Sequence, residues 1–258
     1  MQNRNLKRRN QRPRVATEFP AYQLIETDDG SRTLYSIDDQ ETFHSESGAA
    51  AESSLVFVDN SQLTELPARH LDQNTFRVLE IGFGTGLNFF LTCDRWLNSE
   101  FTSATGLEYV AVESRILPPA LIAGLDYQHL IEHPALLNDW LNWYSGGFGE
   151  ASIKFSRPWT FNNVSLDLQP IDAAGWDYQV SSKFDAIFLD AFSPATNPAL
   201  WSEEFLSRLY GVLGTNRRLV TYCVKSSIQA SLRNLGFEVH TTTGPVNGKR
   251  EVLVATKR

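Results

Sequence analysis

The sequence predicts an α/β protein with a mostly parallel, seven-stranded sheet and a small β extension at its N-terminus. From residue 76 onward, apolar runs of strand length alternate with segments of helical length, which is typical of βα units. Before residue 76, short runs separated by turn residues such as Asp-Asp-Gly at 28–30 indicate hairpins. The 258 residues are 42% hydrophobic and 21% charged, a composition typical of a globular protein that can bury a sizeable core.

These patterns divide the chain into a basic flexible tail (residues 1–17), a β-rich extension (18–75) and an α/β domain (76–258). In the extension we expect only short strands and turns, from residue 18 to about residue 66. In the α/β domain, apolar runs predict strands at residues 77–81, 107–113, 164–171, 184–189, 218–223, 237–241 and 251–255. Helical periodicity predicts helices at residues 86–98, 134–149, 200–213 and 226–235.

Charge is unevenly distributed along the chain. The formal net charge is −7, but residues 1–14 contain six basic residues and no acid, so the remainder carries −13. A basic arm on an acidic body suits a polyanionic partner, because contacts from Lys and Arg to phosphate release counterions. The alternative is a solvated tail that only aids solubility.

Several classes of protein are excluded. The longest apolar stretch, residues 117–125, contains two prolines and a glycine, so a membrane span is not expected. The N-terminus lacks the apolar core of a secretory signal. Cys93 and Cys223 both lie in apolar segments, which favours unpaired thiols in a reducing cytoplasm. The five histidines are scattered and form no cluster with cysteine, so we expect no catalytic metal.

A glycine loop is the first chemical signal. The apolar run that ends at Glu80 and Ile81 leads into GFGTGLN, which opens a helix. Glycines let the backbone turn tightly and approach a ligand without a Cβ clash. A dinucleotide fingerprint would need its third glycine at position 87, where the chain has Leu87. The G-x-G-x-G spacing suits a cofactor without a pyrophosphate, and S-adenosylmethionine fits because it presents an ammonium and a sulfonium. A purely structural strand-to-helix turn is the alternative.

Three carboxylates stand at the ends of successive predicted strands. Glu113 is placed to accept hydrogen bonds from the ribose hydroxyls of a nucleoside cofactor, and Asp172 from an adenine amino group. Asp190 follows a fully apolar strand, where an acid can meet a transferable methyl group and an acceptor nitrogen. Each acid alone is more often a solvated strand end or a turn former. Together they indicate a ligand site, because parallel strands bind ligands at this edge of the sheet.

Several segments resemble one known family. These are LEIGFGTGLN at 79–88, FLDAFSPATNP at 188–198 with a tryptophan at 201, DGSRTLYS at 29–36, FHSESGAAAES at 43–53 and GKREVL at 248–253. In combination they resemble the tRNA 5-aminomethyl-2-thiouridine methyltransferases, the MnmC-like or MnmD group. The resemblance runs from about residue 20 to the end of the chain. It implies a Rossmann-like class I S-adenosylmethionine-dependent methyltransferase fold.

The resemblance also implies a cofactor site and a reaction. The residues assigned to S-adenosylmethionine are Glu80, Gly82, Gly84, Gly86, Asn88, Glu113 and Asp172. The implied reaction is methylation of the aminomethyl group of 5-aminomethyl-(2-thio)uridine at the tRNA wobble position in the anticodon loop. The bifunctional members of the family carry a flavin-dependent oxidase after the methyltransferase, and this chain ends at Arg258, so we expect the stand-alone form.

The chain departs from the family pattern at four positions. The family has glycine, alanine and lysine where Ala191, Ser193 and Thr196 stand, and its Gly-Asp pair is replaced by Ile171 followed by Asp172. The loss of the lysine removes a potential substrate or phosphate contact. Ile171 changes the backbone next to the acid assigned to the adenine.

The mechanism expected from these residues depends on Asp190. An alkyl ammonium is no nucleophile until its lone pair is freed, so Asp190 is the candidate to hold the amine and accept its proton. Phe192 is placed to stack on the displaced wobble base, with a core phenylalanine as the alternative. Pro194 stiffens the following loop on the substrate side.

Further substrate contacts are expected on both sides of this loop. His44, Ser45 and Glu52 belong to the extension and are expected to face the cofactor or the substrate. Lys249 and Arg250 are candidates for a phosphate contact near the pocket, against a simple β-turn with surface charge.

Other functions remain open at this stage. A small-molecule amine such as a polyamine would be an alternative acceptor for the methyl group. A non-catalytic RNA-binding module could keep the fold without binding S-adenosylmethionine. A nicotinamide-dependent oxidoreductase is disfavoured by the glycine spacing.

Overall fold

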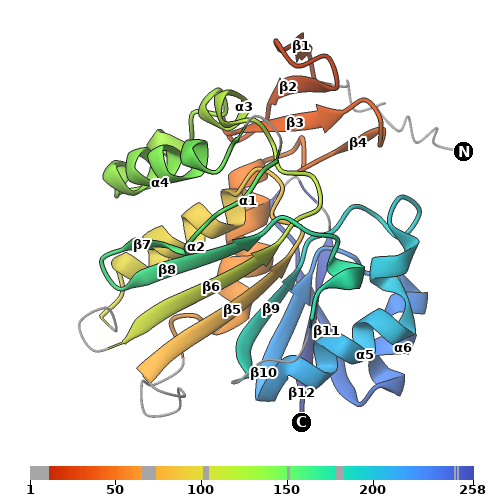
Figure 1. Cartoon of the computed structure of the whole chain (residues 1–258). Coiled ribbons are helices and arrows are strands. Elements are labelled where there is room, and N and C mark those ends of the chain that lie inside the picture. Colours follow the sequence, from red (N-terminus) through yellow and green to blue (C-terminus); the bar gives the residue numbers. More distant parts are fainter. Residues whose placement is uncertain are drawn as a thin grey trace, which may run out of the picture.

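The computed structural model describes residues 12–65, 74–100, 105–149, 152–177, 183–246, 248 and 250–258. Two sheets organise them (Figure 1). The small antiparallel sheet has the order β1-β2-β3-β4 and consists of β1 (Arg14–Ala16), β2 (Tyr22–Glu26), β3 (Arg32–Ser36) and β4 (Glu41–Thr42). The large sheet has the order β11-β12-β10-β9-β5-β6-β8-β7.

The strands of the large sheet follow from the apolar runs of the sequence. They are β5 (Thr75–Ile81), β6 (Gly106–Val112), β7 (Trp159–Phe161), β8 (Val164–Gln169), β9 (Phe184–Leu189), β10 (Leu213–Thr221), β11 (Phe237–Thr243) and β12 (Glu251–Lys257). The pairs formed by β5 with β6 and β9, by β6 with β8 and by β9 with β10 are parallel, whereas β12 and β7 pair antiparallel with their neighbours. The predicted mostly parallel α/β sheet is confirmed.

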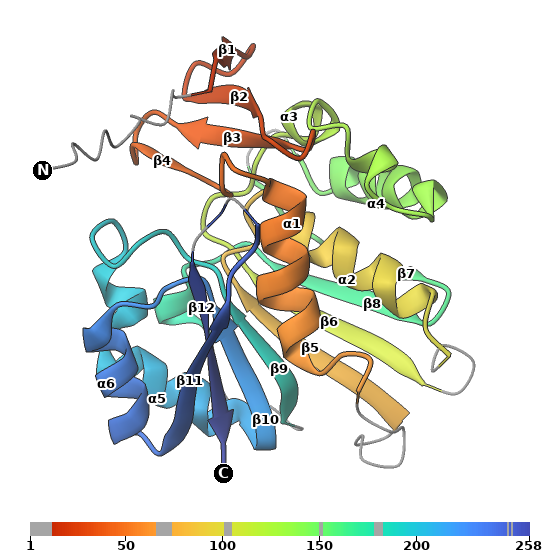
Figure 2. The ribbon, with the colours of Figure 1, turned by 180° about the vertical axis from the view of Figure 1, so that it is seen from behind.

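Helices cover both faces of this sheet (Figures 1 and 2). The helical elements are α1 (Ala49–Ser53), η1 (Ser54–Val58), η2 (Asp59–Ser61), α2 (Leu87–Leu97), α3 (Pro119–Ala123), η5 (Tyr127–His129), α4 (Pro134–Gly146), η6 (Ala173–Gly175), η7 (Pro198–Trp201), α5 (Glu203–Val212) and α6 (Ser226–Asn234). Residues of α1, η1, α2 and α4 belong to one buried apolar cluster, and residues of α5 and α6 belong to a second. Neighbouring strand residues such as Val78 and Leu79 fall into different clusters, as expected for side chains that alternate between the faces of a strand.

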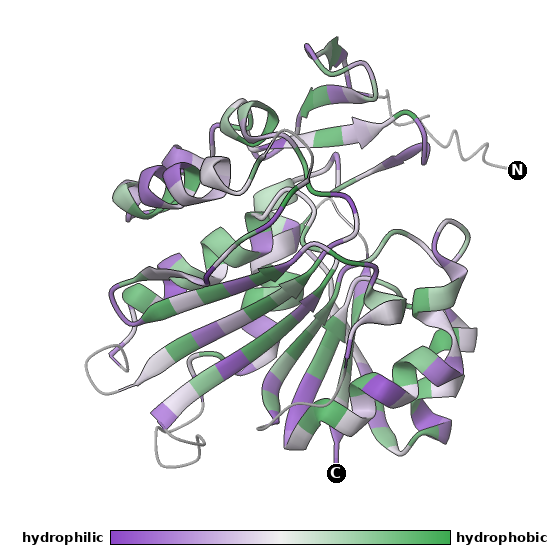
Figure 3. Ribbon diagram, viewed as in Figure 1, coloured by the Kyte–Doolittle hydropathy of each residue, from purple (hydrophilic) through white to green (hydrophobic). Residues whose placement is uncertain are grey.

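The hydropathy of the elements agrees with this layering. Hydrophobic and hydrophilic residues alternate along α5 and α6 (Figure 3), as expected for helices with one face on the sheet. Strand β9 is buried along its whole length. Cys93 and Cys223 are both buried and free, as predicted. No helix among the described residues has the length and apolar character needed to span a membrane.

The small sheet lies over the end of the large sheet at which the parallel strands finish (Figure 1). The guanidinium of Arg115, just after β6, pairs with Asp39 between β3 and β4, with one nitrogen–oxygen distance of 3.2 Å. The guanidinium of Arg32 on β3 donates to the carbonyl of Gly124 at 3.1 Å. Polar contacts therefore dock the small sheet above the strand ends.

Three features of the sequence prediction need correction. Residues 49–58, expected to form strands and turns, are helical, because a run of alanines is a strong helix former and the apolar residues after it pack on α2. Residues 14–16, assigned to the tail, form β1 by pairing with β2. The large sheet has an eighth strand, β7, which a tight turn at Asn162 (φ 51°) folds back on β8. Residues 1–11 of the predicted tail lie outside the described residues.

Candidate functional site

The glycine loop after β5 forms the floor of the site. Gly82, Gly84 and Gly86 have φ angles of 91°, 52° and 78°, a region that side chains with a Cβ rarely adopt. A Cβ on Gly82 would lie 2.8 Å from the carbonyl oxygen of Asp190. The loop after β5 and the loop after β9 are therefore in direct backbone contact, and only glycine permits that contact at position 82.

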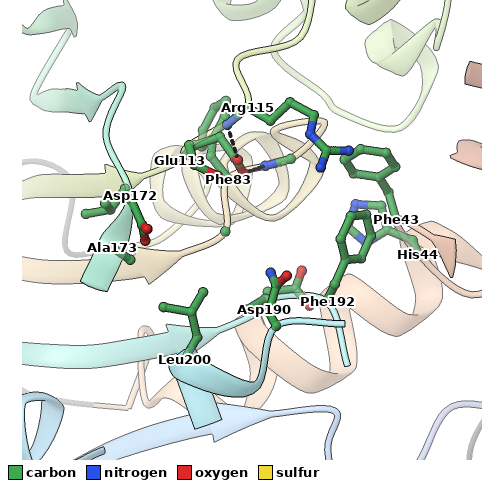
Figure 4. A pocket seen from close by; sticks show the side chains of 16 residues that line it. Phe43, His44, Phe83, Glu113, Arg115, Asp172, Ala173, Asp190, Phe192 and Leu200 are labelled. Atoms are coloured by element: carbon green, nitrogen blue, oxygen red, sulfur yellow. Dashed lines mark hydrogen bonds between the residues drawn. The ribbon is translucent and has the colours of Figure 1, made fainter. Parts of the chain in front are cut away.

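The first cavity lies where the loops after β5, β6, β8 and β9 meet (Figure 4). Its described lining consists of Phe43, His44, Gly82, Phe83, Gly84, Val112, Glu113, Ser114, Arg115, Asp172, Ala173, Asp190, Ala191, Phe192, Asn197 and Leu200. The three acids that the sequence placed at strand ends thus share one cavity. The reason is topological, since each acid follows the carboxyl end of a parallel strand of the same sheet.

Glu113 is fixed by backbone donors. Its Oε2 accepts a hydrogen bond of 2.9 Å from the amide of Gly84, and its Oε1 accepts one of 2.7 Å from the amide of Arg115. Burial raises the pKa of the Glu113 carboxyl, and the two backbone hydrogen bonds oppose this rise. Asp172 caps η6, with Oδ1 accepting from the amide of Ala174 at 2.9 Å. Glu113 and Asp172 lie on the same side of the cavity in Figure 4, away from Phe43 and Phe192.

Beneath the cavity, one amide links two carboxyl groups. The side-chain nitrogen of Asn88 donates to Oδ2 of Asp190 and to Oε1 of Glu80, at 2.8 Å each. Asn88 is 2% exposed and Glu80 is 0% exposed. Burial raises the pKa of Glu80 well above its ordinary range, and the nearby charge of Asp190 raises it further. Burial therefore favours the protonated form of Glu80.

Three residues that the sequence assigns to the cofactor belong to this network or to the glycine loop beside it. Glu80, Gly86 and Asn88 were expected at the cofactor, but none of them lines the first cavity. The side chain of Asn88 faces the two carboxyl groups instead, and Gly86 (φ 78°) is the N-cap of α2. In this arrangement, Asn88 holds the Asp190 carboxylate, Glu80 accepts from the same amide, and Gly86 begins α2.

A second, larger cavity of about 770 Å³ adjoins the first. The two cavities share Phe43, His44, Asp190, Ala191 and Phe192. The second cavity is otherwise lined mainly by the N-terminal part of the chain, and it includes the predicted residues Ser45 and Glu52. Asp190 thus lies at the junction between a cavity at the glycine loop and a wider cavity under the small sheet.

Two aromatic rings stand at this junction. The rings of Phe43 and Phe192 are in an edge-to-face arrangement with centroids 5.1 Å apart (Figure 4). Phe43 follows β4, whereas Phe192 follows β9. Phe192 was identified from the sequence but Phe43 was not, although Phe43 opens the FHSES segment. Its position immediately before His44 was the only local signal.

The segment after Phe43 is tied to the glycine loop. Nε2 of His44 lies 3.0 Å from Oγ1 of Thr85, which in turn accepts a hydrogen bond of 2.8 Å from the hydroxyl of Tyr127. The amide of Ser45 donates to Oε2 of Glu52 at 2.8 Å. The structure thus places His44, Ser45 and Glu52 in the lining of the cavity that Asp190 also lines.

Glu41 on β4 is a residue that sequence reasoning missed. Its carboxylate accepts hydrogen bonds from the amide of Ser193 at 3.1 Å, from the Ser193 hydroxyl at 2.6 Å and from the Thr196 hydroxyl. Burial acts to raise the pKa of Glu41, but the hydroxyl donors hold it below its ordinary value. Two of the positions that depart from the family pattern therefore have a structural partner, because each supplies a hydroxyl to Glu41.

The remaining predicted residues lie elsewhere. Pro194 is in the loop after β9 but lines neither cavity, and the exposed Arg250 also lines neither. Gly248, next to these basic residues, does line the second cavity. Lys249 lies outside the described residues.

Comparisons with known proteins agree with this geometry. Residues 140–258 match a family model described as S-adenosyl-L-methionine-dependent methyltransferase. The tRNA 5-methylaminomethyl-2-thiouridine biosynthesis bifunctional protein MnmC of Magnetococcus marinus is 32% identical over 224 residues, which are 86% of this chain and 32% of that protein. MnmC of Aromatoleum aromaticum is 31% identical over 231 residues, which are 89% of this chain and 34% of that protein. The chain therefore spans about a third of the length of these curated relatives.

One solved structure has the same fold over nearly the whole chain. The crystal structure of MNMC2 from Aquifex aeolicus aligns with a TM-score of 0.71 and 28% sequence identity, covering 93% of this chain and 71% of that one. The family and the fold imply S-adenosylmethionine as the cofactor. Residues 140–258 thus match the S-adenosyl-L-methionine-dependent methyltransferase family, and the chain is a homologue of the MnmC proteins over about a third of their length.

Proposed function

We propose that the chain transfers a methyl group from S-adenosylmethionine to the aminomethyl nitrogen of 5-aminomethyl-(2-thio)uridine at the tRNA wobble position. The product is 5-methylaminomethyl-(2-thio)uridine. The observation that carries this proposal is the position of Asp190 at the junction of the two cavities. The relationship to MnmC, whose name specifies this modified uridine, supports the choice of substrate.

The first cavity fits the cofactor. A Cβ on Gly84 would lie 2.9 Å from the ring of Phe43, so glycine at this position lets the ring pack directly on the loop that lines the cavity. Glu113 would accept hydrogen bonds from the ribose hydroxyls. Hydrogen bonds from two backbone amides hold its carboxylate in a fixed orientation. Asp172 would accept from the adenine amino group, with Ala173 and Leu200 as apolar walls. When bound, the cofactor supplies an electrophilic methyl group.

The chain's own residues would prepare the acceptor amine. Methyl transfer is an in-line displacement, so the protein mainly aligns the acceptor nitrogen and holds its lone pair toward the first cavity. Asp190 would bind the substrate ammonium from the second cavity and accept one of its protons. Asn88 holds Oδ2 of Asp190 through a 2.8 Å hydrogen bond and so fixes the direction of the carboxylate. Such proton transfer is typically worth about 10²–10⁴-fold in rate.

Phe43 and Phe192 would receive the displaced base. Both rings line the second cavity, and stacking of a base on such aromatic surface is worth roughly 1–3 kcal/mol. The carboxylates of the second cavity suit the positive charge of the aminomethyl group. In this proposal the partner is the tRNA anticodon loop, and the chain acts in the cytoplasm. Residues 76–258 would form the methyltransferase domain and residues 18–75 its substrate-side extension.

The decisive experiment uses the purified chain with labelled S-adenosylmethionine and bulk tRNA that carries the aminomethyl base. Nucleoside analysis should find label in the methylaminomethyl nucleoside. Asp190→Asn should lose this activity while retaining cofactor affinity in calorimetry. A second arm replaces tRNA with spermidine as the acceptor. Transfer to spermidine without transfer to tRNA, or normal turnover by Asp190→Asn, would contradict the proposal.

A further inference from the structure

We propose that Arg12 and Arg14 form a phosphate-binding pair on the rim of the second cavity. The pair would hold the RNA backbone beside the nucleotide whose base reaches Asp190. This inference rests on the proposed function, because it takes the occupant of the second cavity to be a nucleotide of an RNA strand. It concerns a binding surface for the rest of that strand.

Both arginines line the same cavity as Asp190 and Phe192. The other charged residues of its described lining are acidic, namely Asp28, Glu41, Glu46, Glu52 and Asp190. Among the lysines and arginines of the chain's described parts, only Arg12 and Arg14 contribute to this lining. An acidic cavity suits an ammonium group but repels a phosphate, so an RNA substrate needs cations where its backbone crosses the rim.

Arg14 is held in a position suited to this role. Strand β1 pairs it with Ile25 of β2, and its guanidinium carbon lies 3.5 Å from the centre of the Tyr35 ring. A guanidinium stacked on an aromatic ring keeps the donors on its edges available, and less of its freedom is lost when it binds an anion. Its carboxylate neighbour, Glu46, is 3.7 Å away, beyond the distance of a good hydrogen bond.

Arg12 is the more exposed member of the pair, and its side chain is 45% accessible. It pairs with Asp28, whose side chain is 28% accessible, and its backbone amide lies 3.4 Å from Oε2 of Glu46. Ion pairs this exposed contribute little, because water solvates both partners. A phosphate can replace the carboxylate, since a guanidinium presents two parallel donors that match two phosphate oxygens.

The two arginines therefore connect the two charge regions noted in the sequence. They are the last basic residues of the +6 segment, and both line the acidic second cavity. The chemistry favours a single-stranded RNA segment, because its backbone can follow the rim while one base turns inward.

The test is the salt dependence of tRNA binding, measured by fluorescence anisotropy at several salt concentrations. We expect Arg12→Ala/Arg14→Ala to lower affinity at least about tenfold near 0.1 M salt. The slope of log affinity against log salt should fall by about 1.5, which corresponds to two lost phosphate contacts. The matched control is Arg233→Ala/Arg258→Ala, which removes the same charge from residues that line neither cavity. The control should keep nearly the wild-type slope, and so should Arg12→Lys/Arg14→Lys.

Two further measurements separate the possible outcomes. Unchanged affinity for S-adenosylmethionine, measured on the same variants, would show that the first cavity is intact. If the wild-type chain binds and methylates tRNA while the alanine pair keeps the wild-type slope, or if the control pair weakens binding equally, the phosphate pair is overturned and the proposed function stands. If the wild-type chain binds no tRNA, the phosphate-binding pair and the proposed function are both overturned.

Discussion

Asn88 donates a hydrogen bond of 2.8 Å to Oδ2 of Asp190, while the same amide group donates to the buried Glu80. Asn88 lies in the first turn of α2, directly after the glycine loop, and Asp190 directly follows β9. The orientation of Asp190 is thus set by a residue that is 102 positions away in the chain.

Replacing Asn88 by alanine should lower turnover without weakening cofactor binding. The substitution removes the donor that directs Asp190, and misplacement of a reacting group by about 1 Å can cost roughly 10²-fold in rate. Steady-state kinetics should show the loss in kcat, while calorimetry with S-adenosylmethionine should give an unchanged Kd. Asn98→Ala, at the exposed far end of the same helix, is the control. A large loss of cofactor affinity in Asn88→Ala would instead assign Asn88 to the cofactor.

Replacing Glu80 by glutamine should change how stability depends on pH. Burial raises the pKa of Glu80 far above the ordinary value of 4.5, so the folded state keeps a proton that the unfolded state releases. Wild-type stability therefore falls as pH rises above 4.5, and a neutral glutamine avoids this loss. As pH rises, the unfolding free energy of the variant should increase relative to that of the wild type. The total gain should be about 1.4 kcal/mol for each unit by which folding raises the pKa of Glu80.

Urea unfolding between acid and mildly alkaline pH would measure this difference. Glu203→Gln, which changes an exposed carboxylate on α5, is the control. Its unfolding free energy should depend on pH in the same way as that of the wild type. Parallel curves for Glu80→Gln would mean that Glu80 is ionised in the folded protein.

Removing the Glu41 carboxylate should release the loop after β9 from the small sheet. Glu41→Ala loses three hydrogen bonds to Ser193 and Thr196, and we expect a cost of about 1–3 kcal/mol in unfolding free energy. The pKa of Glu41 is lowered in the folded state, so its contribution is present above the ordinary value of 4.5 and is lost as pH falls. The difference from the wild type should therefore shrink in acid.

The matched substitution is Glu26→Ala, because Glu26 is exposed on strand β2 of the same small sheet. Chemical denaturation at neutral and acid pH would compare the two variants. Equal stabilities for both variants at neutral pH would show that the Glu41 contacts contribute nothing.

Gly82→Ala and Gly211→Ala should have opposite effects. An alanine at 82 would adopt a φ of 91° and place its Cβ 2.8 Å from the Asp190 carbonyl oxygen, so we expect a loss above about 1 kcal/mol. Gly211 lies in α5, and a Cβ there would meet no heavy atom within 4 Å, so alanine should stabilise by roughly 0.5–1 kcal/mol. Thermal unfolding would measure both, and a Gly82→Ala variant as stable as the wild type would contradict the tight loop contact.

The central sheet and the acids at its edge could be predicted because their signals are local. An apolar run that ends in an acid marks a buried strand and its exposed end. Because the strands are parallel, their carboxyl ends lie at one edge of the sheet. The grouping of Glu113, Asp172 and Asp190 at that edge can therefore be predicted before any of their contacts is known. The glycine loop adds a backbone signal at the same edge.

Contacts between distant segments could not be read from the sequence. Glu41 lies 152 positions from Ser193, and nothing around either residue indicates the other. Phe43 gave no periodic pattern, since it follows a two-residue strand. Asn88 was assigned to the cofactor because it ends the glycine motif, whereas its burial between two carboxyl groups depends on the packing of α2.

The small sheet that covers the site precedes, in the chain, the loops after β5 and β9 that it contacts. During synthesis, residues 39–44 emerge from the ribosome well ahead of β9, and Glu41 can reach Ser193 only after the loop that follows β9 has been made. Such long-range contacts close more slowly than local hairpins form, so the hairpins of the small sheet should form early and their docking on the loop after β9 should come late. A ligand that contacts both the small sheet and the loops after β5 and β9 would bind only when the small sheet is docked. Ligand binding would therefore stabilise the docked state of the small sheet.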